Sequence, residues 1–508
     1  MVEEVQISIE ELIKFGLSNK MIEKWDVQLV RNSIMDILGI SEPYGGELGN
    51  CGVVDSPVGI LAELLQYAVD SNIIEDTVTY RDMLDARIMA TLMPRPSELV
   101  SKFYGIADDK GIESATDYYY KLSKDSNYIR MDRIDKNEYW VADTQVGELE
   151  ITINLSKPEK DPKEIEKARS MPSANYPKCF LCIDNVGYPG RLNHPARNNH
   201  RVIPVKLSSE NWYLQYSPYV YYNEHCIVFN EKHVPMKISK DTFVRLLSFV
   251  EKFPHYFVGS NADLPIVGGS ILSHDHFQGG HHVFPMEKAS IIKELRKDGY
   301  EEVKIGLVRW PLSVVRLSSK DKDKLIELAE EILGKWRDYS DDSLGILAYT
   351  EEDGNRIPHN TITPIARING DGDYELDLVL RNNRRSEEHP DGIFHPHAHL
   401  HHIKKENIGL IEVMGLAVLP VRLKQELSLI EDILVGKIKE RAEYEELEKH
   451  GEWINRLVEE YGIDMKADEA RECIRKEVGN IFAQVLECAG VYKMDEEGIA
   501  GLERFINS

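Results

Sequence analysis

The sequence predicts an α+β protein in which an antiparallel sheet occupies the middle of the chain and helical segments flank it at both ends. Apolar residues recur every three to four positions near both ends, which is the spacing of an amphipathic helix. Between them, short alternating and β-branched runs are separated by Pro, Asn and Gly, as in strands joined by turns. At roughly 150 residues per domain, the 508 residues suffice for about two to four structural units.

The first segment, residues 1–137, is predicted to be helical. The runs ILAELLQYAV, TYRDMLDARIMATLM and PSELVSKFYGI each carry helical spacing, and Pro94 and the polar DDKG close two of them. The last segment, residues 423–508, is also predicted to be helical. Its longest run is KQELSLIEDILVGKIKERAEYEELEK, residues 424–449, which is charged and amphipathic.

The two middle segments, residues 138–300 and 301–422, have the texture of strands. EYWVADTQVGELEITINLSK opens the first, followed by HRVIPVKL and HCIVFN, with one predicted helix from Lys240 to Phe253. VKIGLVRWPLSVVRL, RIPHNTITPIARI and YELDLVLRN continue the pattern in the second. This mixture favours an antiparallel sheet of α+β type.

The charge excludes some classes of function. Lys and Arg total 61 against 86 Asp and Glu, a net charge of −25 that repels nucleic acid and anionic membrane surfaces. An anionic substrate therefore requires a local cation cluster. Arg381, Arg384 and Arg385 are the candidates, and a solvated basic turn is the alternative.

The sequence predicts a cytoplasmic protein without a membrane segment. Its six cysteines are sparse, which suits a reducing compartment. The N-terminus lacks the basic and apolar regions of a signal peptide. The longest apolar stretch, Ile408 to Val421, is interrupted and shorter than the roughly 20 residues of a membrane helix.

Cys179 and Cys182 form a CxxC pair, whose spacing lets two thiolates on one tight turn face a single cation. A redox pair normally leads into a helix, whereas turn residues follow this one, so metal binding is favoured. A tetrahedral site needs two further ligands, for which the candidates are His225, His233 and His274. A pair of buried free thiols is the alternative.

The run DLPIVGGSILSHDHFQGG combines glycines with two histidines and a glutamine. Gly268 and Gly269 permit close approach of the backbone to a phosphate. On an extended segment, His274, His276 and Gln278 share one face. A neutral imidazole is both a nucleophile toward phosphorus and a leaving group, so the pattern suits two-step nucleotidyl transfer, with Gln278 donating to the phosphoryl oxygens. A metal-binding histidine pair on a strand fits equally well.

This run, the CFLC pair, NEHCIVFNEKHVPMKI and HPHAHLHHIKKENIGLIEVMG together resemble the class II galactose-1-phosphate uridylyltransferases of the histidine-triad superfamily. The likeness extends by motif over residues 170–425. It implies two histidine-triad-like halves around an antiparallel sheet, flanked by helices. By analogy with the class I enzymes, it also implies a homodimer.

The resemblance assigns roles residue by residue. Cys179, Cys182, His233 and His274 are implied to bind a structural zinc ion, and His276 to become uridylylated while the backbone carbonyl of His274 holds one of its ring nitrogens. The implied substrate contacts, with those suggested by the motifs, are Asn261, Gly268, Gly269, Ser270, Gln278, Arg381, Lys405 and Glu412. Asp275 stands where the class I enzymes have proline, and its carboxylate is expected to favour the protonated form of His276.

A second metal is a further hypothesis. Of the 17 histidines, 14 lie between His225 and His402. If residues 395–402 form a strand, the histidines at alternate positions share a face that has the donor chemistry of a metal site, together with His359. These are His395, His397, His399 and His401. A polar strand face with substrate contacts is the alternative.

The predicted reaction is reversible uridylyl transfer. UDP-glucose gives UMP to His276 and releases glucose 1-phosphate, and galactose 1-phosphate then leaves as UDP-galactose. Two alternatives remain open. One is another histidine-triad nucleotide phosphorylase or hydrolase, and the other is a non-catalytic, zinc-stabilised binding protein.

Overall fold

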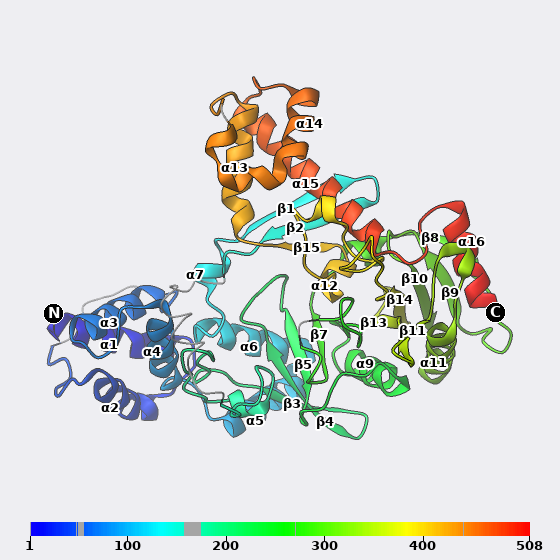
Figure 1. Cartoon of the computed structure of the whole chain (residues 1–508). Helices are drawn as coiled ribbons and strands as arrows, with labels where there is room; N and C mark the ends of the chain where they lie inside the picture. The colour runs from blue at the N-terminus through cyan, green and yellow to red at the C-terminus, as the bar shows by residue number, and fades with distance from the viewer. Residues whose placement is uncertain (1, 47, 49–54, 157–173, 270, 440) are drawn as a thin grey trace. The chain divides into compact units, whose positions relative to one another are not determined.

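The structure is a computed structural model that describes residues 2–46, 48, 55–156, 174–269, 271–439 and 441–508 (Figure 1). The chain forms two compact units. Unit 1 comprises Met1–Lys136, Ser156–Val220 and Glu224–Val234, and unit 2 comprises Asn137–Leu155, Tyr221–Asn223 and Pro235–Ser508. These units are defined by contacts in space, whereas the four predicted segments follow the chain, and those segment boundaries stay a prediction.

Unit 1 contains the predicted N-terminal helices. They are α1 (Val2–Ser18), α2 (Val27–Leu38), α3 (Val58–Asp70), α4 (Val78–Ala90), α5 (Pro96–Lys110), α6 (Ile112–Asp125) and α7 (Met131–Ile134), with 3-10 turns η1 (Lys24–Asp26) and η2 (Ile183–Asn185). Helix α5 continues through the polar residues expected to close it. It ends at Gly111, whose φ of 90° is a backbone conformation that favours glycine.

Unit 1 also contains three antiparallel strands, β3 (Ile203–Leu207), β4 (Glu210–Tyr216) and β5 (Cys226–Asn230), with β4 paired to both neighbours. The alternating apolar residues of β3 are buried, as the sequence pattern predicts. The hydroxyl of Tyr216 donates to the Thr116 carbonyl at 3.1 Å, which fastens β4 to helix α6.

The large sheet of unit 2 has the strand order β7-β6-β13-β14-β10-β9-β8, and every neighbouring pair is antiparallel. The strands are β6 (Phe257–Gly259), β7 (His276–Gly280), β8 (Ile291–Leu295), β9 (Lys304–Val308), β10 (Val314–Ser319), β13 (Asn360–Ile368) and β14 (Tyr374–Asn382), with a separate hairpin of β11 (Tyr349–Glu352) and β12 (Asn355–Pro358). The chain combines these antiparallel strands with helices, so the predicted α+β class is confirmed.

A smaller sheet of unit 2 pairs β1 (Glu138–Thr144) with β2 (Gly147–Ile153) and β2 with β15 (Leu416–Leu419). The β2–β15 pair is parallel, whereas the sequence predicted antiparallel pairing. A parallel pair joins strands that are distant in the chain, so no local turn signal marks it.

The helices of unit 2 are α9 (Lys240–Lys252), α10 (Pro285–Lys288), α11 (Lys322–Asp338), α12 (Leu410–Val413), α13 (Arg422–Leu434), α14 (Gly451–Tyr461), α15 (Ala467–Ala489) and α16 (Glu496–Asn507). The 3-10 turns are η3 (Asp342–Leu344), η4 (Ala398–Leu400), η5 (Arg441–Glu443) and η6 (Glu445–His450). Figure 1 shows α13, α14 and α15 grouped together, with α15 lying along β1. None of the helices in the described parts of the chain is long and apolar enough to cross a membrane.

The single long helix predicted for residues 424–449 is wrong. Helix α13 ends at Leu434, and Gly436 adopts a left-handed backbone with a φ of 73°. A side chain at Gly436 would come within 2.7 Å of the Ile463 carbonyl oxygen. Periodicity alone does not reveal this break, because the apolar spacing continues through it.

A buried ion network holds the large sheet together. Asp377 on β14 is fully buried and accepts hydrogen bonds from Arg316 Nε at 2.7 Å and from Arg367 Nη2 at 2.8 Å. Burial by itself would raise the pKa of Asp377, but the two guanidinium groups outweigh it and lower the pKa.

We expect Asp377→Asn to destabilise the protein by about 3–5 kcal/mol, because it removes the fully buried carboxylate that the buried Arg367 and the partly buried Arg316 share. The shift of the urea unfolding midpoint measures this cost. Asp371→Asn, in the exposed turn that precedes β14, is the matched control and should change stability by less than about 0.5 kcal/mol. Equal effects of the two variants would contradict the prediction.

Candidate active site and metal centre

The CxxC turn brings two thiols together in unit 1. Cys179 Sγ lies 3.5 Å from Cys182 Sγ, and the Leu181 N–H donates to Cys179 Sγ at 3.4 Å. His233, in the segment after β5, places its Nδ1 3.2 Å from Cys182 Sγ. The chain turns tightly at the cysteines and then enters η2, with no α-helix following, as expected for a metal-binding turn rather than a redox pair.

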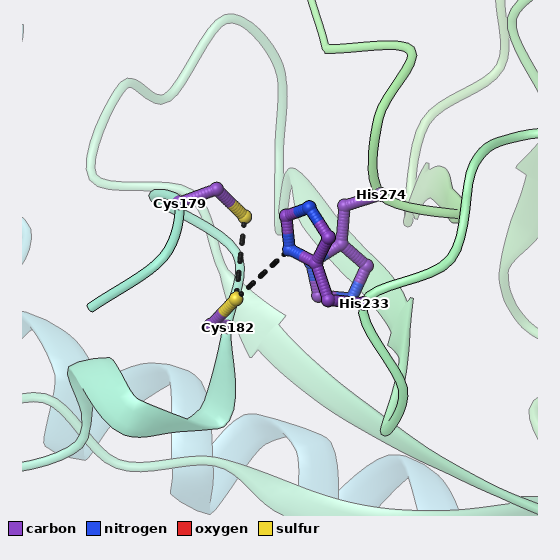
Figure 2. Close-up of side chains that lie close together, drawn as sticks. All are labelled: Cys179, Cys182, His233 and His274. Carbon is purple, nitrogen blue, oxygen red and sulfur yellow. Dashed lines mark hydrogen bonds between the residues drawn. The ribbon is translucent and has the colours of Figure 1, made fainter. Parts of the chain in front are cut away.

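His274 completes the cluster. Each of Cys179, Cys182, His233 and His274 offers one ligand atom, and these atoms all lie within 4.8 Å of one another. Figure 2 shows the two thiols and the two imidazoles gathered around one point. His225 lies outside the cluster, and its Nδ1 bonds instead to the Tyr219 carbonyl at 2.9 Å. The donor set of two sulfurs and two nitrogens fits a tetrahedral metal ion.

His276 opens strand β7 two residues after the cluster. It is 5% exposed, and its Nδ1 lies 2.8 Å from the His274 carbonyl oxygen, the contact that the resemblance implied. A carbonyl only accepts, so Nδ1 carries the proton and Nε2 carries the lone pair. Burial lowers the pKa of His276 to about 4, which leaves the imidazole neutral at pH 7.

Asp275 does not have the predicted effect on its neighbour. Its carboxylate was expected to favour protonated His276, whereas the pKa of His276 is lowered. Two physical reasons account for the difference. Burial of the imidazole is the largest influence, and the Asp275 carboxylate lies 3.6 Å from the Arg245 guanidinium, which offsets its charge.

Only part of the predicted shared face exists. Strand β7 begins at His276, so His276 and Gln278 alternate along it while His274 precedes it. Gln278 pairs in register with Gly259 of β6, and its buried Oε1 has no hydrogen-bond partner among the described residues. A side-chain amide with an unused polar atom lies two positions from the buried imidazole, which suits a contact with a ligand.

The two glycines before β7 are closely surrounded, Gly268 by the backbone of the preceding loop and Gly269 by the side chain of Asn261. A side chain at Gly268 would come within 2.5 Å of the Ala262 carbonyl oxygen, and one at Gly269 within 2.8 Å of Asn261 Nδ2. The backbone oxygens leave no room for a side chain at Gly268, and a side chain at Gly269 would displace the Asn261 amide. Ser270 lies outside the described residues.

Three predicted substrate residues converge on the turn at residues 408–410. Asn261 Oδ1 accepts the Leu410 N–H at 2.9 Å, and Arg381 Nη2 donates to the Ile408 carbonyl at 2.9 Å. Glu412 Oε2 accepts the Gly409 N–H at 3.2 Å. Residues 149 positions apart in the chain thus meet at one turn.

Arg381 is 1% exposed on β14, and burial lowers the pKa of its guanidinium to about 10. It holds the 408–410 turn in this structure, and its direct contact with a substrate stays a prediction. The cation cluster of Arg381, Arg384 and Arg385 stays a prediction. Arg384 donates to the Gly345 carbonyl at 2.5 Å, and Arg385 is exposed.

Lys404 is a residue of this region that sequence reasoning missed. It is 3% exposed, and its Nζ donates to Glu412 Oε1 and to the Val418 carbonyl, both at 2.9 Å. The predicted residue, Lys405, is exposed. The two lysines are adjacent, so the motif could not tell which of them is buried against Glu412.

The strand predicted for residues 395–402 is wrong. The segment contains the 3-10 turn η4 instead of a strand. The Leu400 N–H donates to the His397 carbonyl and the His401 N–H to the Ala398 carbonyl, and these short-range bonds after Pro396 form the turn. His359 instead bonds Thr350 and Asn383 through its two ring nitrogens. Within the described ranges, the Cys179–His274 cluster is the one group of metal-ligating side chains, so the second metal site is not assembled.

The fold and the site define a mixed α+β protein that joins a Cys₂His₂ cluster to a buried, neutral histidine. Its sequence matches the galactose-1-phosphate uridyl transferase N-terminal domain over residues 20–235 and the C-terminal domain over residues 249–448. The galactose-1-phosphate uridylyltransferase of Caldanaerobacter subterraneus is 60% identical and covers 98% of this chain and 97% of its own. That of Bacillus subtilis is 50% identical over 98% of this chain and 96% of its own.

A crystal structure of yeast Ap4A phosphorylase covers 74% of this chain and 97% of its own, with 11% identity and a TM-score of 0.31. The family match rests on the sequence comparisons, which extend over nearly the whole chain. The protein belongs to the galactose-1-phosphate uridylyltransferase family.

Proposed function

We propose that the protein transfers UMP from UDP-glucose to galactose 1-phosphate through a uridylyl group on His276. The observation that carries the proposal is the state of His276, which is buried and neutral, with Nδ1 held by the His274 carbonyl. Membership of the family supports the identity of the substrates, since its full-length relatives are named galactose-1-phosphate uridylyltransferases. The activity makes the protein a nucleotidyltransferase of galactose metabolism.

In the first half-reaction, the Nε2 lone pair of His276 attacks the α-phosphorus of UDP-glucose. A phosphorus–nitrogen bond forms, and the bond to the bridging oxygen breaks, so that its electron pair leaves with glucose 1-phosphate. The imidazole gains positive charge in this step. The His274 carbonyl stabilises that charge by accepting from Nδ1–H, at 2.8 Å in this structure.

In the second half-reaction, a phosphate oxygen of galactose 1-phosphate attacks the same phosphorus. The phosphorus–nitrogen bond breaks, and its electron pair returns to Nε2 as UDP-galactose leaves. Gln278 and Asn261 contact the transferred phosphoryl group, and the Gly268–Gly269 backbone approaches it closely. One nucleophile serves both halves, because each exchanges one sugar phosphate for another.

The metal proposed for the Cys₂His₂ cluster is zinc, since zinc accepts two thiolates and two imidazoles in tetrahedral geometry. When bound, it would hold in place the backbone segment that carries the His274 carbonyl. A cytoplasmic location suits the sparse cysteines, and we propose a homodimer by analogy with the class I enzymes.

Isotope exchange tests the covalent route. With labelled glucose 1-phosphate, UDP-glucose and no galactose 1-phosphate, the protein should move label into UDP-glucose, because the first half-reaction is reversible. Addition of galactose 1-phosphate should then yield UDP-galactose. Label exchange without UDP-galactose would instead point to a phosphorylase or hydrolase of the same superfamily, and no exchange would contradict the covalent intermediate.

Lys405 and Glu412 are proposed to bind the phosphate and a hydroxyl of the hexose phosphate, respectively. We expect Lys405→Ala to raise the KM for galactose 1-phosphate about tenfold or more, because a charge-assisted hydrogen bond contributes about 1.5–3 kcal/mol. Initial-rate kinetics measure the change. Lys466→Ala, at an 83% exposed lysine before α15, is the control. An unchanged KM would make Lys405 a solvated surface residue.

A further inference from the structure

The loop after the CxxC turn contains a side chain whose amide N–H groups both bond to the backbone of that turn. Asn185, the last residue of η2, is 2% exposed. Its Nδ2 donates to the Cys179 carbonyl and to the Cys182 carbonyl, both at 2.8 Å. One amide therefore bridges the backbones of both cysteines and fixes the distance between them.

A second side chain fixes the orientation of that amide. His194 is 5% exposed, and its Nε2 donates to Asn185 Oδ1 at 2.7 Å. This bond leaves only the Nδ2 edge of the amide facing the cysteine carbonyls. Burial, with Arg191 and Arg197 nearby, lowers the pKa of His194 to about 4, so the ring is a neutral donor.

Packing and backbone bonds hold His194 in place. Its ring lies 5.0 Å from the ring of Phe180, the residue that follows Cys179, and 5.3 Å from the ring of Tyr188. Its backbone N–H and carbonyl both pair with Arg191, at 2.9 and 2.8 Å. The residue is therefore fixed by contacts on several sides, and its ring nitrogen is committed to Asn185 rather than to the cluster.

We infer that Asn185 and His194 are positioning residues for the metal centre, which hold the backbone of Cys179 and Cys182 so that both thiols face one ion. The inference rests on the metal cluster of the proposed function. Partners of this kind that orient metal ligands typically change metal affinity about 10- to 100-fold when they are removed.

The test compares zinc retention in four variants during competition with a chelator of known affinity, in the absence of any substrate. Asn185→Asp replaces two donors by an acceptor that faces two carbonyls, and we expect its zinc affinity to fall about 10- to 100-fold. The zinc affinity of His194→Leu should also fall. His194→Gln should stay within about threefold of the wild type, because its amide can donate to Asn185 Oδ1.

Asn199→Asp is the matched control. Asn199 is 3% exposed in the same unit and donates to the Ser126 carbonyl at 2.9 Å rather than to a cysteine carbonyl. It should keep wild-type zinc affinity. If Asn185→Asp fails to fold, the His194→Leu and His194→Gln pair still decides the question.

Wild-type zinc affinity in His194→Leu or in a folded Asn185→Asp variant would overturn the inference. An equal loss in Asn199→Asp would also overturn it, because the loss would then reflect general destabilisation. Label exchange between glucose 1-phosphate and UDP-glucose, measured separately, keeps the two proposals apart. Normal exchange with unchanged zinc affinity refutes the positioning role and leaves the transfer reaction standing.

Discussion

Replacing His276 with alanine is expected to abolish uridylyl transfer while the protein stays folded and keeps its metal. Alanine removes the nucleophile, so the loss in kcat should be about 10⁴-fold or more. The backbone carbonyl of His274 and the cluster ligands remain, because the substitution changes only the side chain at position 276. The expected result thus separates loss of chemistry from loss of structure.

Intact mass after brief exposure to UDP-glucose measures this directly, with released glucose 1-phosphate removed enzymatically. The wild type should gain the mass of a uridylyl group and lose it on addition of galactose 1-phosphate. His276→Ala should show no gain. His281→Ala, at an exposed histidine just beyond β7, is the matched control and should gain the mass. A uridylyl group on His276→Ala would place the nucleophile elsewhere.

Replacing Cys182 with serine is expected to have the second largest effect, which is loss of the metal. Cys182 lies at the centre of the contacts in Figure 2, 3.5 Å from Cys179 Sγ and 3.2 Å from His233 Nδ1. A serine hydroxyl is a poor zinc ligand, so the zinc affinity should fall about 10³-fold or more. The exchange rate should fall about 10- to 100-fold, because the His274 carbonyl loses its fixed position.

Zinc content by atomic emission, after dialysis against a chelator, measures the first effect. Cys473→Ser, at a half-buried cysteine of α15, is the control and should keep its zinc. Zinc retained by Cys182→Ser would show that the cluster is not the metal site. Normal exchange in a zinc-free variant would show that the metal does not position His276.

Secondary structure predicted from residue spacing was confirmed where neighbouring residues alone determine the element. Apolar spacing placed α3, α4 and α9, and alternation placed β1 and β2, because helical and strand periods are written in neighbouring residues. The same reasoning failed for residues 424–449 and 395–402. In residues 424–449, the left-handed backbone of Gly436, close to the Ile463 carbonyl, follows the end of the helix. In residues 395–402, histidines alternate as they would on a strand, but the chain forms a 3-10 turn.

The candidate site divides in a similar way. CxxC spacing and the HDHFQ run marked Cys179, Cys182, His274, His276 and Gln278, since each motif is contained within a few residues. Asn185, His194 and Lys404 had no such signal. Their roles depend on burial, whereas polar side chains in loops are ordinarily solvated.

The sequence by itself determined the fold class, the motifs and the family of this protein, because periodicity, spacing and motif composition are properties of short stretches of chain. Tertiary structure decided which of two adjacent lysines is buried on Glu412, that Arg381 lies within the sheet, and that Asp275 leaves His276 neutral. These outcomes depend on desolvation and on long-range partners such as Arg245. Burial and charge pairing are set by the folded chain as a whole, so no local pattern contains them.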